Sequence, residues 1–440
     1  MKIIIVLILT VIFSTSIIIP QSQNESDSLL NKATLVDCIQ YALAHQPSVQ
    51  QSLINEQIED QVIKSQLSNW FPQIGFNFNI QHNFQLPTSM FLGSSNKTGS
   101  INTSSGQFSV SQTIFNRDVL FASSTASDLR KQAEQSTIEN KINVIVNVSK
   151  AYYAVLLSQN QIDLAKQNIT RLKQSLNDAY NQYEGGIVDK TDYMQATIAL
   201  NNAKAELRQN QEQLKISYAN LKELMGYPPN DEIQLNNDMA KMEDDIGIDT
   251  SETLNYQNRI EYKLLQTQKQ LQDANLNYYK WSFIPSLSAF GEYNLNFQNN
   301  QLSNLYNHNY PNSYVGLQLS FPIFQGGKRI HQIEQAKLEL KLIDYDKSSL
   351  ESSIYIEYTQ ALANYKSNLN NFQVQKNNIN MAKEVYDIIE LQYKSGVKTY
   401  LDVITAETNL RSTQVNYLIA LYQVLASKLD LQKAFGTISY

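Results

Sequence analysis

Two kinds of hydrophobic pattern alternate along the chain. In some short segments apolar and polar residues take turns, as in Phe76-Asn77-Phe78-Asn79-Ile80, which is the pattern of a β-strand with one apolar face. We expect four such strands, at approximately residues 72–84, 106–115, 285–298 and 313–324. Segments almost free of Pro and Gly separate them and predict helices at residues 35–69, 118–184, 189–225, 253–281 and 328–394, with a last helix that ends at residue 435. Loops are expected at residues 86–106 and 299–312.

The two longest helical segments carry the pattern of a coiled coil. Apolar residues recur every seven positions, and a second set lies between them in residues 118–184, which indicates a seam of helix-to-helix packing. A helix of this length spans roughly 100 Å. The seam positions are Ile162, Ile169, Leu176 and Tyr183 with Ala165, Leu172 and Ala179, and then Phe372, Ile379, Tyr386 and Tyr393 in the second long segment.

The second half of the chain repeats the first. The turn at Tyr183-Glu184-Gly185-Gly186-Ile187 recurs as Tyr393-Lys394-Ser395-Gly396-Val397, and the same offset carries Asp192 to Asp402 and Gly226 to Gly436. A duplication of this length means that one structural unit is built twice and packed side by side. Two shorter helices stacked end to end match one long helix, so we expect all strands at one end of a rod and the glycine turns at the other.

The repeat defines the organisation of the chain. A charged residue, a short apolar run and a polar exit predict a secretory signal peptide at residues 1–23. Residues 24–226 form the first repeat and residues 253–440 the second, while residues 227–252 are an insert rich in acidic residues. We expect the two repeats and the insert to form one elongated body.

Composition excludes several classes of function. The net charge of −6 and the absence of a basic stripe argue against nucleic-acid binding. The single cysteine, Cys38, excludes an intrachain disulfide. The four histidines lack ligand spacing, and no catalytic motif occurs, so we expect no metal, no cofactor and no enzymatic activity.

The strands require partners that one chain does not supply. A lone hairpin cannot bury its aromatic side chains or pair its edges, whereas a closed barrel in lipid does both. Phe76, Phe78, Ile80, Leu317 and Leu319 are predicted to face lipid, and Asn77, Asn79 and Gln318 to face water. Two chains would supply eight strands and a filled interior, and three chains twelve strands and an aqueous lumen, which favours a homotrimer. The alternative is that the hairpins cap a soluble coiled-coil rod.

In this order of elements the chain resembles the TolC-like outer-membrane efflux protein family over nearly all of its mature length. The resemblance rests on the opening Ala42-Leu43-Ala44-His45-Gln46-Pro47, the junctions Phe71-Pro72 and Ile284-Pro285, the exit from Phe321 to Arg329, and the two tips. It implies a fold that is mainly α with a small β part: a long α-barrel of duplicated helical hairpins below a trimeric twelve-stranded transmembrane β-barrel in the outer membrane. The acidic insert and the end of the chain would form a belt around the tube.

The resemblance also implies a function and its residues. The chain would be the passive exit duct of a tripartite efflux or type I secretion system that exports small molecules or proteins handed over by an inner-membrane pump and a periplasmic adaptor. Asp402 would constrict the periplasmic entrance, with Thr405 one turn later where many members carry a second acid, and Lys398 would tie neighbouring helices together. The alternative is a structural coiled-coil protein of the cell envelope. The residues expected to contact the adaptor at the tips are Gly186, Ile187, Asp192, Gly396, Val397 and Lys398.

Overall fold

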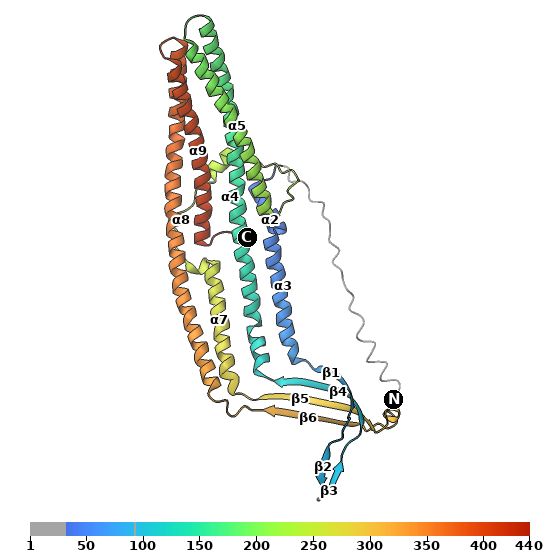
Figure 1. The fold of residues 1–440 in the computed structure, drawn as a ribbon. Coiled ribbons are helices and arrows are strands. Elements are labelled where there is room, and N and C mark those ends of the chain that lie inside the picture. The colour runs from blue at the N-terminus through green and yellow to red at the C-terminus, as the bar shows by residue number, and fades with distance from the viewer. Residues whose placement is uncertain (1–31, 92–93) are drawn as a thin grey trace.

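Four long helices and a sheet at one end of them make up the molecule (Figure 1). The computed structural model describes residues 32–91 and 94–440, so the predicted signal peptide at residues 1–23 lies outside the described residues. The helices α4 (Arg117–Glu184) and α5 (Lys190–Met225) form one antiparallel hairpin, and α8 (Lys328–Lys394) and α9 (Tyr400–Phe435) form the other. Within the described part of the chain, none of the helices has the length and apolar character needed to cross a membrane.

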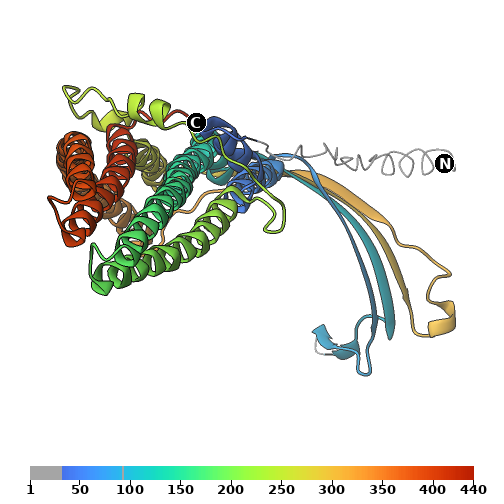
Figure 2. The same ribbon diagram turned by 90° about the horizontal axis from the view of Figure 1, so that it is seen from above.

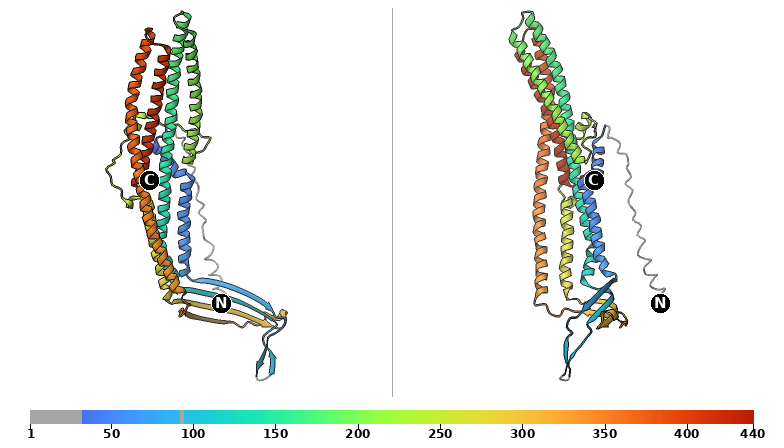
Figure 3. Two further views of the ribbon diagram at one scale, coloured as in Figure 1. Left: turned by 60° about the vertical axis from the view of Figure 1, so that its left-hand side comes forward. Right: turned by 45° about the vertical axis from the view of Figure 1, so that its right-hand side comes forward.

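Shorter helices complete each long hairpin. In the first repeat α2 (Leu35–His45) and α3 (Pro47–Leu67) continue the line of α5, and in the second repeat α7 (Ile260–Lys280) continues the line of α9 (Figures 1 and 3). All strands therefore leave from one end of the bundle, and both glycine turns lie at the other end, as the helix lengths predict. The fold class predicted from the sequence, mainly helical with long hairpins and four sheet strands in each chain, is confirmed.

The glycines at the ends of α5 and α9 explain how the end-to-end stacking is possible. Gly226 and Gly436 adopt left-handed φ values of 68° and 73°. A Cβ atom at Gly226 would lie 2.7 Å from the carbonyl oxygen of His45, and one at Gly436 would lie 2.8 Å from the backbone of Asn258. Only a residue without a side chain allows each long helix to end against the beginning of the helix that continues it.

Two predicted helices differ from the observed ones. The helix expected at residues 35–69 breaks at Gln46, whose ψ of 121° is extended, because the residue before a proline avoids the helical region. The helix expected at residues 253–281 begins only at Ile260, after a short 3-10 turn, η2 (Tyr256–Asn258). The Asn255 side chain accepts a hydrogen bond from the backbone of Gln257, a local contact that competes with helix formation.

The sheet has the order β1-β4-β5-β6, with every neighbouring pair antiparallel. Its strands are β1 (Gln73–His82), β4 (Asn102–Phe115), β5 (Ser286–Asn299) and β6 (Asn312–Ser320). They curve strongly and extend to one side of the helices (Figure 2). Within the described chain, the outer edges of β1 and β6 pair with no other strand of this sheet.

Three strand and loop boundaries were predicted incorrectly. The strand expected at 313–324 ends at Ser320, since Pro322 has no N–H to pair and Gly326 and Gly327 turn the chain. The loop expected at 86–106 contains a small hairpin, β2 (Thr88–Phe91) with β3 (Ser94–Lys97). The same predicted loop also holds the start of β4, whose polar residues 102–106 pair with both β1 and β5.

Three apolar clusters hold the helices together. The largest lies at mid-height, where α2, α4, α5 and α9 meet, and it includes the fully buried Cys38, Val155 and Leu221. Met242 and Ile246 of the insert join this cluster, so part of the acidic segment packs on the helices. Burial raises the pKa of the Cys38 thiol to about 12 and so disfavours the reactive thiolate. Nearer the tips, heptad positions such as Leu172, Ala179 and Tyr386 form the other two clusters.

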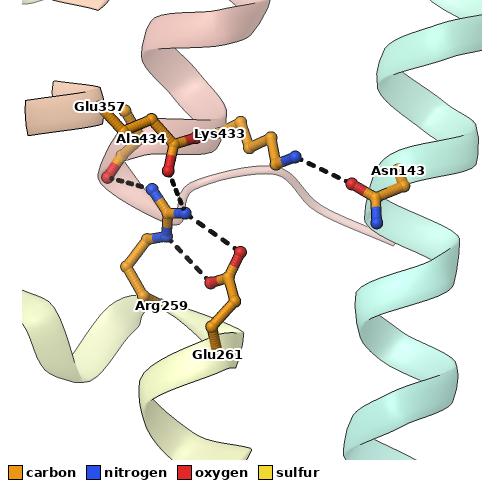
Figure 4. Close-up of polar contacts among 6 residues, drawn as sticks. All are labelled: Asn143, Arg259, Glu261, Glu357, Lys433 and Ala434. Carbon is orange, nitrogen blue, oxygen red and sulfur yellow. Dashed lines mark hydrogen bonds and ion pairs between the residues drawn. The ribbon is translucent and has the colours of Figure 1, made fainter. Parts of the chain in front are cut away.

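A buried arginine, Arg259, links the helices of the second repeat to one another near the middle of the bundle. The Arg259 side chain is 3% exposed and donates hydrogen bonds to Glu261 (3.0 Å), to Glu357 (2.7 Å) and to the carbonyl oxygen of Ala434 (3.3 Å) (Figure 4). Burial opposes the ionisation of Glu261, but the hydrogen bonds and charge of Arg259 outweigh it and hold the pKa of Glu261 below its ordinary value. One guanidinium therefore fastens α7 to α8 and to the end of α9.

Candidate functional site

The two helical tips share one backbone geometry. Gly186 and Gly396 both have a φ of 74°. The N–H of Gly186 donates to the carbonyl oxygen of Tyr183 and that of Ile187 to Gln182, both at 2.9 Å, and Gly396 and Val397 repeat the two bonds on Tyr393 and Gln392 at the same distance. This is the Schellman ending of a helix, which needs a left-handed residue.

The tips present apolar side chains to the surroundings. Ile187 is 76% exposed and Val397 is 71% exposed, and no atom lies within 4 Å of a Cβ placed on Gly186 or Gly396. Two matched apolar residues therefore project from the end of the bundle. Exposed apolar side chains grouped at one end of a molecule are a feature of protein–protein contact sites.

Asp402 caps the helix that follows the second tip. Its carboxylate accepts hydrogen bonds from the backbone N–H of Thr399 (3.0 Å) and from the Thr399 hydroxyl (2.8 Å), which is one half of a capping box. These two hydrogen bonds, with a smaller contribution from Lys398, hold the pKa of Asp402 below its ordinary value. Lys398 lies 3.9 Å from this carboxylate, and the exposed Thr405 hydroxyl donates to the carbonyl oxygen of Leu401.

The equivalent site in the first repeat has the opposite electrostatics. Asp189 takes the place of Thr399, and its side chain makes no cap hydrogen bond. Asp189 also has no hydroxyl to donate to Asp192, as Thr399 does to Asp402. Burial, followed by the charge of Asp189, raises the pKa of Asp192. Of the two aspartates paired by the repeat, the surroundings of Asp402 favour its ionised form and those of Asp192 disfavour it.

Buried tyrosines join the two hairpins just inside the tips. The Tyr400 hydroxyl accepts a hydrogen bond from Ser175 on α4 (3.2 Å), and the Tyr393 hydroxyl donates to Gln182 (3.1 Å). Burial and then the nearby charge of Asp192 raise the pKa of Tyr393 to about 12. The heptad pattern includes Tyr393 as a seam residue, but no pattern in the sequence assigns either tyrosine a site role.

A cavity of about 420 Å³ lies between the hairpins behind the tips. Its lining combines apolar side chains, such as Leu172 and Ile404, with polar and charged ones that include Glu407 and Arg411. Arg411 pairs with Glu206 of α5 at 3.0 Å, and Glu407, which is 4% exposed, lies near Arg171 of α4. Burial outweighs that arginine and raises the pKa of Glu407. No motif or spacing in the sequence indicates the contact between Arg171 and Glu407.

The sheet at the other end has one apolar and one polar face. Register places Phe76 beside Phe108, with ring centroids 4.7 Å apart, and Phe108 beside Tyr293. Asn77 pairs with Gln107 on the opposite face. All five residues predicted to face lipid lie on the apolar face, and they are between 53% and 69% exposed: Phe76, Phe78, Ile80, Leu317 and Leu319.

One charged residue of the polar face is absent from the predicted site residues. Glu292 on β5 lies in register with Tyr314 on β6, and it is the only Asp, Glu, Lys or Arg in the four strands of the sheet. A lone charge in an alternating strand is a signal that the sequence does contain. Among the described residues, no three His, Cys, Asp or Glu side chains form a group able to hold a metal ion.

Comparison with known proteins identifies this arrangement. Residues 38–227 and 258–437 match the family model described as outer membrane efflux protein. The chain is 23% identical over 333 residues to the outer membrane protein TolC of Vibrio cholerae, which covers 75% of this chain and 76% of that protein. It is 21% identical over 437 residues to TolC of Escherichia coli, which covers 96% and 86%.

Solved structures show the same fold. The crystal structure of the outer membrane protein VceC from Vibrio cholerae aligns with a TM-score of 0.73 and 14% identity over 91% of this chain and 96% of that chain. A structure of CusC aligns with a TM-score of 0.73 and 17% identity over 91% of both chains.

Proposed function

The chain belongs to the outer membrane efflux protein family, and from that premise we propose that three copies join edge to edge into one conduit whose tips dock on a periplasmic adaptor and an inner-membrane pump. The protein is an outer-membrane efflux channel of the TolC type and not an enzyme. The trimer, the environment of each face of the sheet and the roles of the tip residues are the parts of this proposal.

The edges of the chain support closure by further copies. β1 and β6 are the two ends of the sheet, and a strand edge without a partner is normally paired or covered. α3 and α8 lie along opposite edges of the helical layer (Figure 1). Each carries exposed apolar residues four positions apart, Ile54 and Ile58 on α3 and Leu338 and Leu342 on α8. A head-to-tail contact of one edge with the other generates a ring.

In such a trimer the apolar face of the sheet contacts lipid and the polar face contacts water. With β6 of one copy beside β1 of the next, the twelve strands of three copies have no free edge, as a structure in lipid requires. Phe76, Phe78, Ile80, Leu317 and Leu319 face lipid, and the Asn, Gln and Ser side chains of the other face line an aqueous lumen. Twelve strands leave space for such a lumen, whereas eight do not.

The tips provide the entrance. Ile187 and Val397 offer the adaptor an apolar contact at each turn, beside Gly186, Gly396, Asp192 and Lys398. Three copies of Asp402 constrict the pore with negative charge, and Thr405 in the next turn adds none. The low pKa of the Asp402 carboxylate suits this role, because a carboxylate held by its own cap stays charged when others approach.

The observation that carries the proposal is a sheet with one apolar face, one polar face and two open edges at the end of a long helical bundle. The test is to purify the protein from outer membranes and to measure its mass in detergent and its conductance in planar bilayers. We expect the mass of three chains and discrete channels. A monomeric rod that stays soluble without detergent would instead support the structural coiled-coil alternative.

A further inference from the structure

The polar face of the sheet is uniform except at one place. This is the face that carries Asn77 and Gln107. Along most of each strand, the side chains on it are Asn, Gln, Ser and Thr. The exceptions with larger or charged groups are neighbours on β5 and β6: Phe290, Glu292 and Tyr314. The one carboxylate and the two aromatic rings of this face thus lie together.

The carboxylate is held in place by neutral donors. Gln107 on β4 donates to Oε2 of Glu292 at 2.6 Å, and the Tyr314 hydroxyl on β6 donates to the same oxygen. Neutral donors orient a carboxylate and favour its ionised form without cancelling its charge. No Lys or Arg occurs in the four strands of the sheet, so the charge has no cationic partner there.

The aromatic rings are positioned by a glycine. A Cβ atom at Gly316 would lie 2.8 Å from the Phe290 ring, so the ring occupies the place of the missing side chain. It meets the Tyr314 ring edge to face, with centroids 6.2 Å apart and planes at 75°. Tyr314 is 46% exposed, which leaves aromatic surface open beside the carboxylate.

An anionic group beside aromatic faces is the combination that recognises organic cations. The carboxylate attracts the positive charge, and the rings contact the apolar groups attached to it and contribute a cation–π attraction. Inorganic cations gain little from the rings, and anions are repelled by the carboxylate.

We propose that Glu292, Tyr314 and Phe290 form a weak binding site for organic ammonium ions on the lumen face of the barrel, with one copy in each chain. The inference rests on the proposed channel, in which this polar face lines the lumen. A weak site suits a conduit, because a transported molecule must leave it again.

The test uses benzyltrimethylammonium, which carries a permanent charge and one ring, added to the barrel side of single channels in planar bilayers. Its apparent Kd is taken from the reversible reduction of the current. We expect Glu292→Gln, a change of equal size, to weaken binding about tenfold, and Phe290→Leu to weaken it about threefold. Benzenesulfonate, an anion of similar size, should lose no affinity in either variant, because the carboxylate repels it.

A second variant separates a built site from a general negative field. Adding Gln298→Glu to Glu292→Gln returns one carboxylate to the same face of β5, three residues further along that face than Glu292 and far from the two rings. We expect this double variant to recover the preference for K⁺ over Cl⁻ but not the affinity for benzyltrimethylammonium. Equal affinity in wild type and Glu292→Gln, or full recovery in the double variant, would overturn the inference. Failure of the wild type to conduct K⁺ would instead count against the proposed function.

Discussion

Arg171 on α4 and Glu407 on α9 approach each other to 3.5 Å between Nε and Oε1, and neither atom has a hydrogen-bond partner among the described residues. The pair joins the two hairpins behind the tips, where little water reaches the carboxylate. Removing a carboxylate from water costs more than a single imperfect ion pair returns. The contact therefore makes the union of the hairpins dependent on pH.

The first prediction concerns Glu407→Gln. Because burial raises the pKa of Glu407, the folded protein binds this proton more tightly than the unfolded chain does. Protonated Glu407 therefore stabilises the folded state. Its contribution to the free energy of unfolding is complete below the unfolded pKa of about 4.3 and is lost as the pH rises through the pKa of Glu407 in the folded protein. The variant should therefore have a higher Tm than wild type at pH 8, with the difference shrinking towards pH 4. A constant difference over that range would show that Glu407 does not titrate with folding.

The second prediction compares the two kinds of glycine. Gly396→Ala meets only backbone strain, since its Cβ has open space, and should cost about 1 kcal/mol of stability. Gly436→Ala adds a clash with the backbone of Asn258 and should cost clearly more. Equilibrium unfolding of both variants measures the difference. Equal losses would mean that the joint between α9 and α7 is not tightly packed.

A third prediction addresses docking at the tips. Gly186→Val and Gly396→Val place a β-branched residue in the left-handed region, which distorts the turn and should abolish export while leaving trimers in the membrane. Asn at the same positions tolerates this conformation and should retain most export. Normal export by both valine variants would show that docking does not depend on the shape of the turns.

The fourth prediction concerns charge at the entrance. Asp402→Asn removes the charge but keeps oxygen that can accept the hydrogen bonds from Thr399, so it should reduce cation preference and block by multivalent cations without loss of the cap. Thr399→Ala weakens the cap and keeps the charge, and it should leave selectivity in place. Bilayer recordings with both variants decide between the roles. If selectivity falls only with Thr399→Ala, Asp402 serves the helix and not the pore.

The fifth prediction tests the faces of the sheet. Phe78→Arg should cost roughly 2–4 kcal/mol if the side chain faces the middle of the bilayer, whereas its neighbour Asn79→Arg should cost much less in the lumen. The yield of heat-stable trimer from membranes reports both. Similar yields from the two variants would contradict the assigned faces.

Periodicity predicted those parts of the fold whose contacts are local. The seven-residue seam located both long hairpins, and alternation located the strand faces, because each signal depends on neighbours within one element. The start of α7 was missed because the contact of the Asn255 side chain with the backbone of Gln257 leaves no trace in the hydrophobic periodicity. The burial of Arg259 was not predicted because it depends on Glu357 and Ala434, far away in the sequence. The Arg171–Glu407 contact likewise joins the two repeats, and neither residue stands out in its own helix.

The two tips have one backbone and two chemistries. Gly186 and Gly396 share a φ of 74°, yet the N-cap residue of the following helix is Asp189 in the first repeat and Thr399 in the second. In the proposed trimer, a partner that recognises the shape of the turns has six nearly equivalent binding sites. A partner that recognises their charge has two alternating sets of three. One end of the molecule can therefore dock a partner with sixfold symmetry or one with threefold symmetry, depending on whether the partner contacts the backbone shape that the turns share or the charges in which they differ.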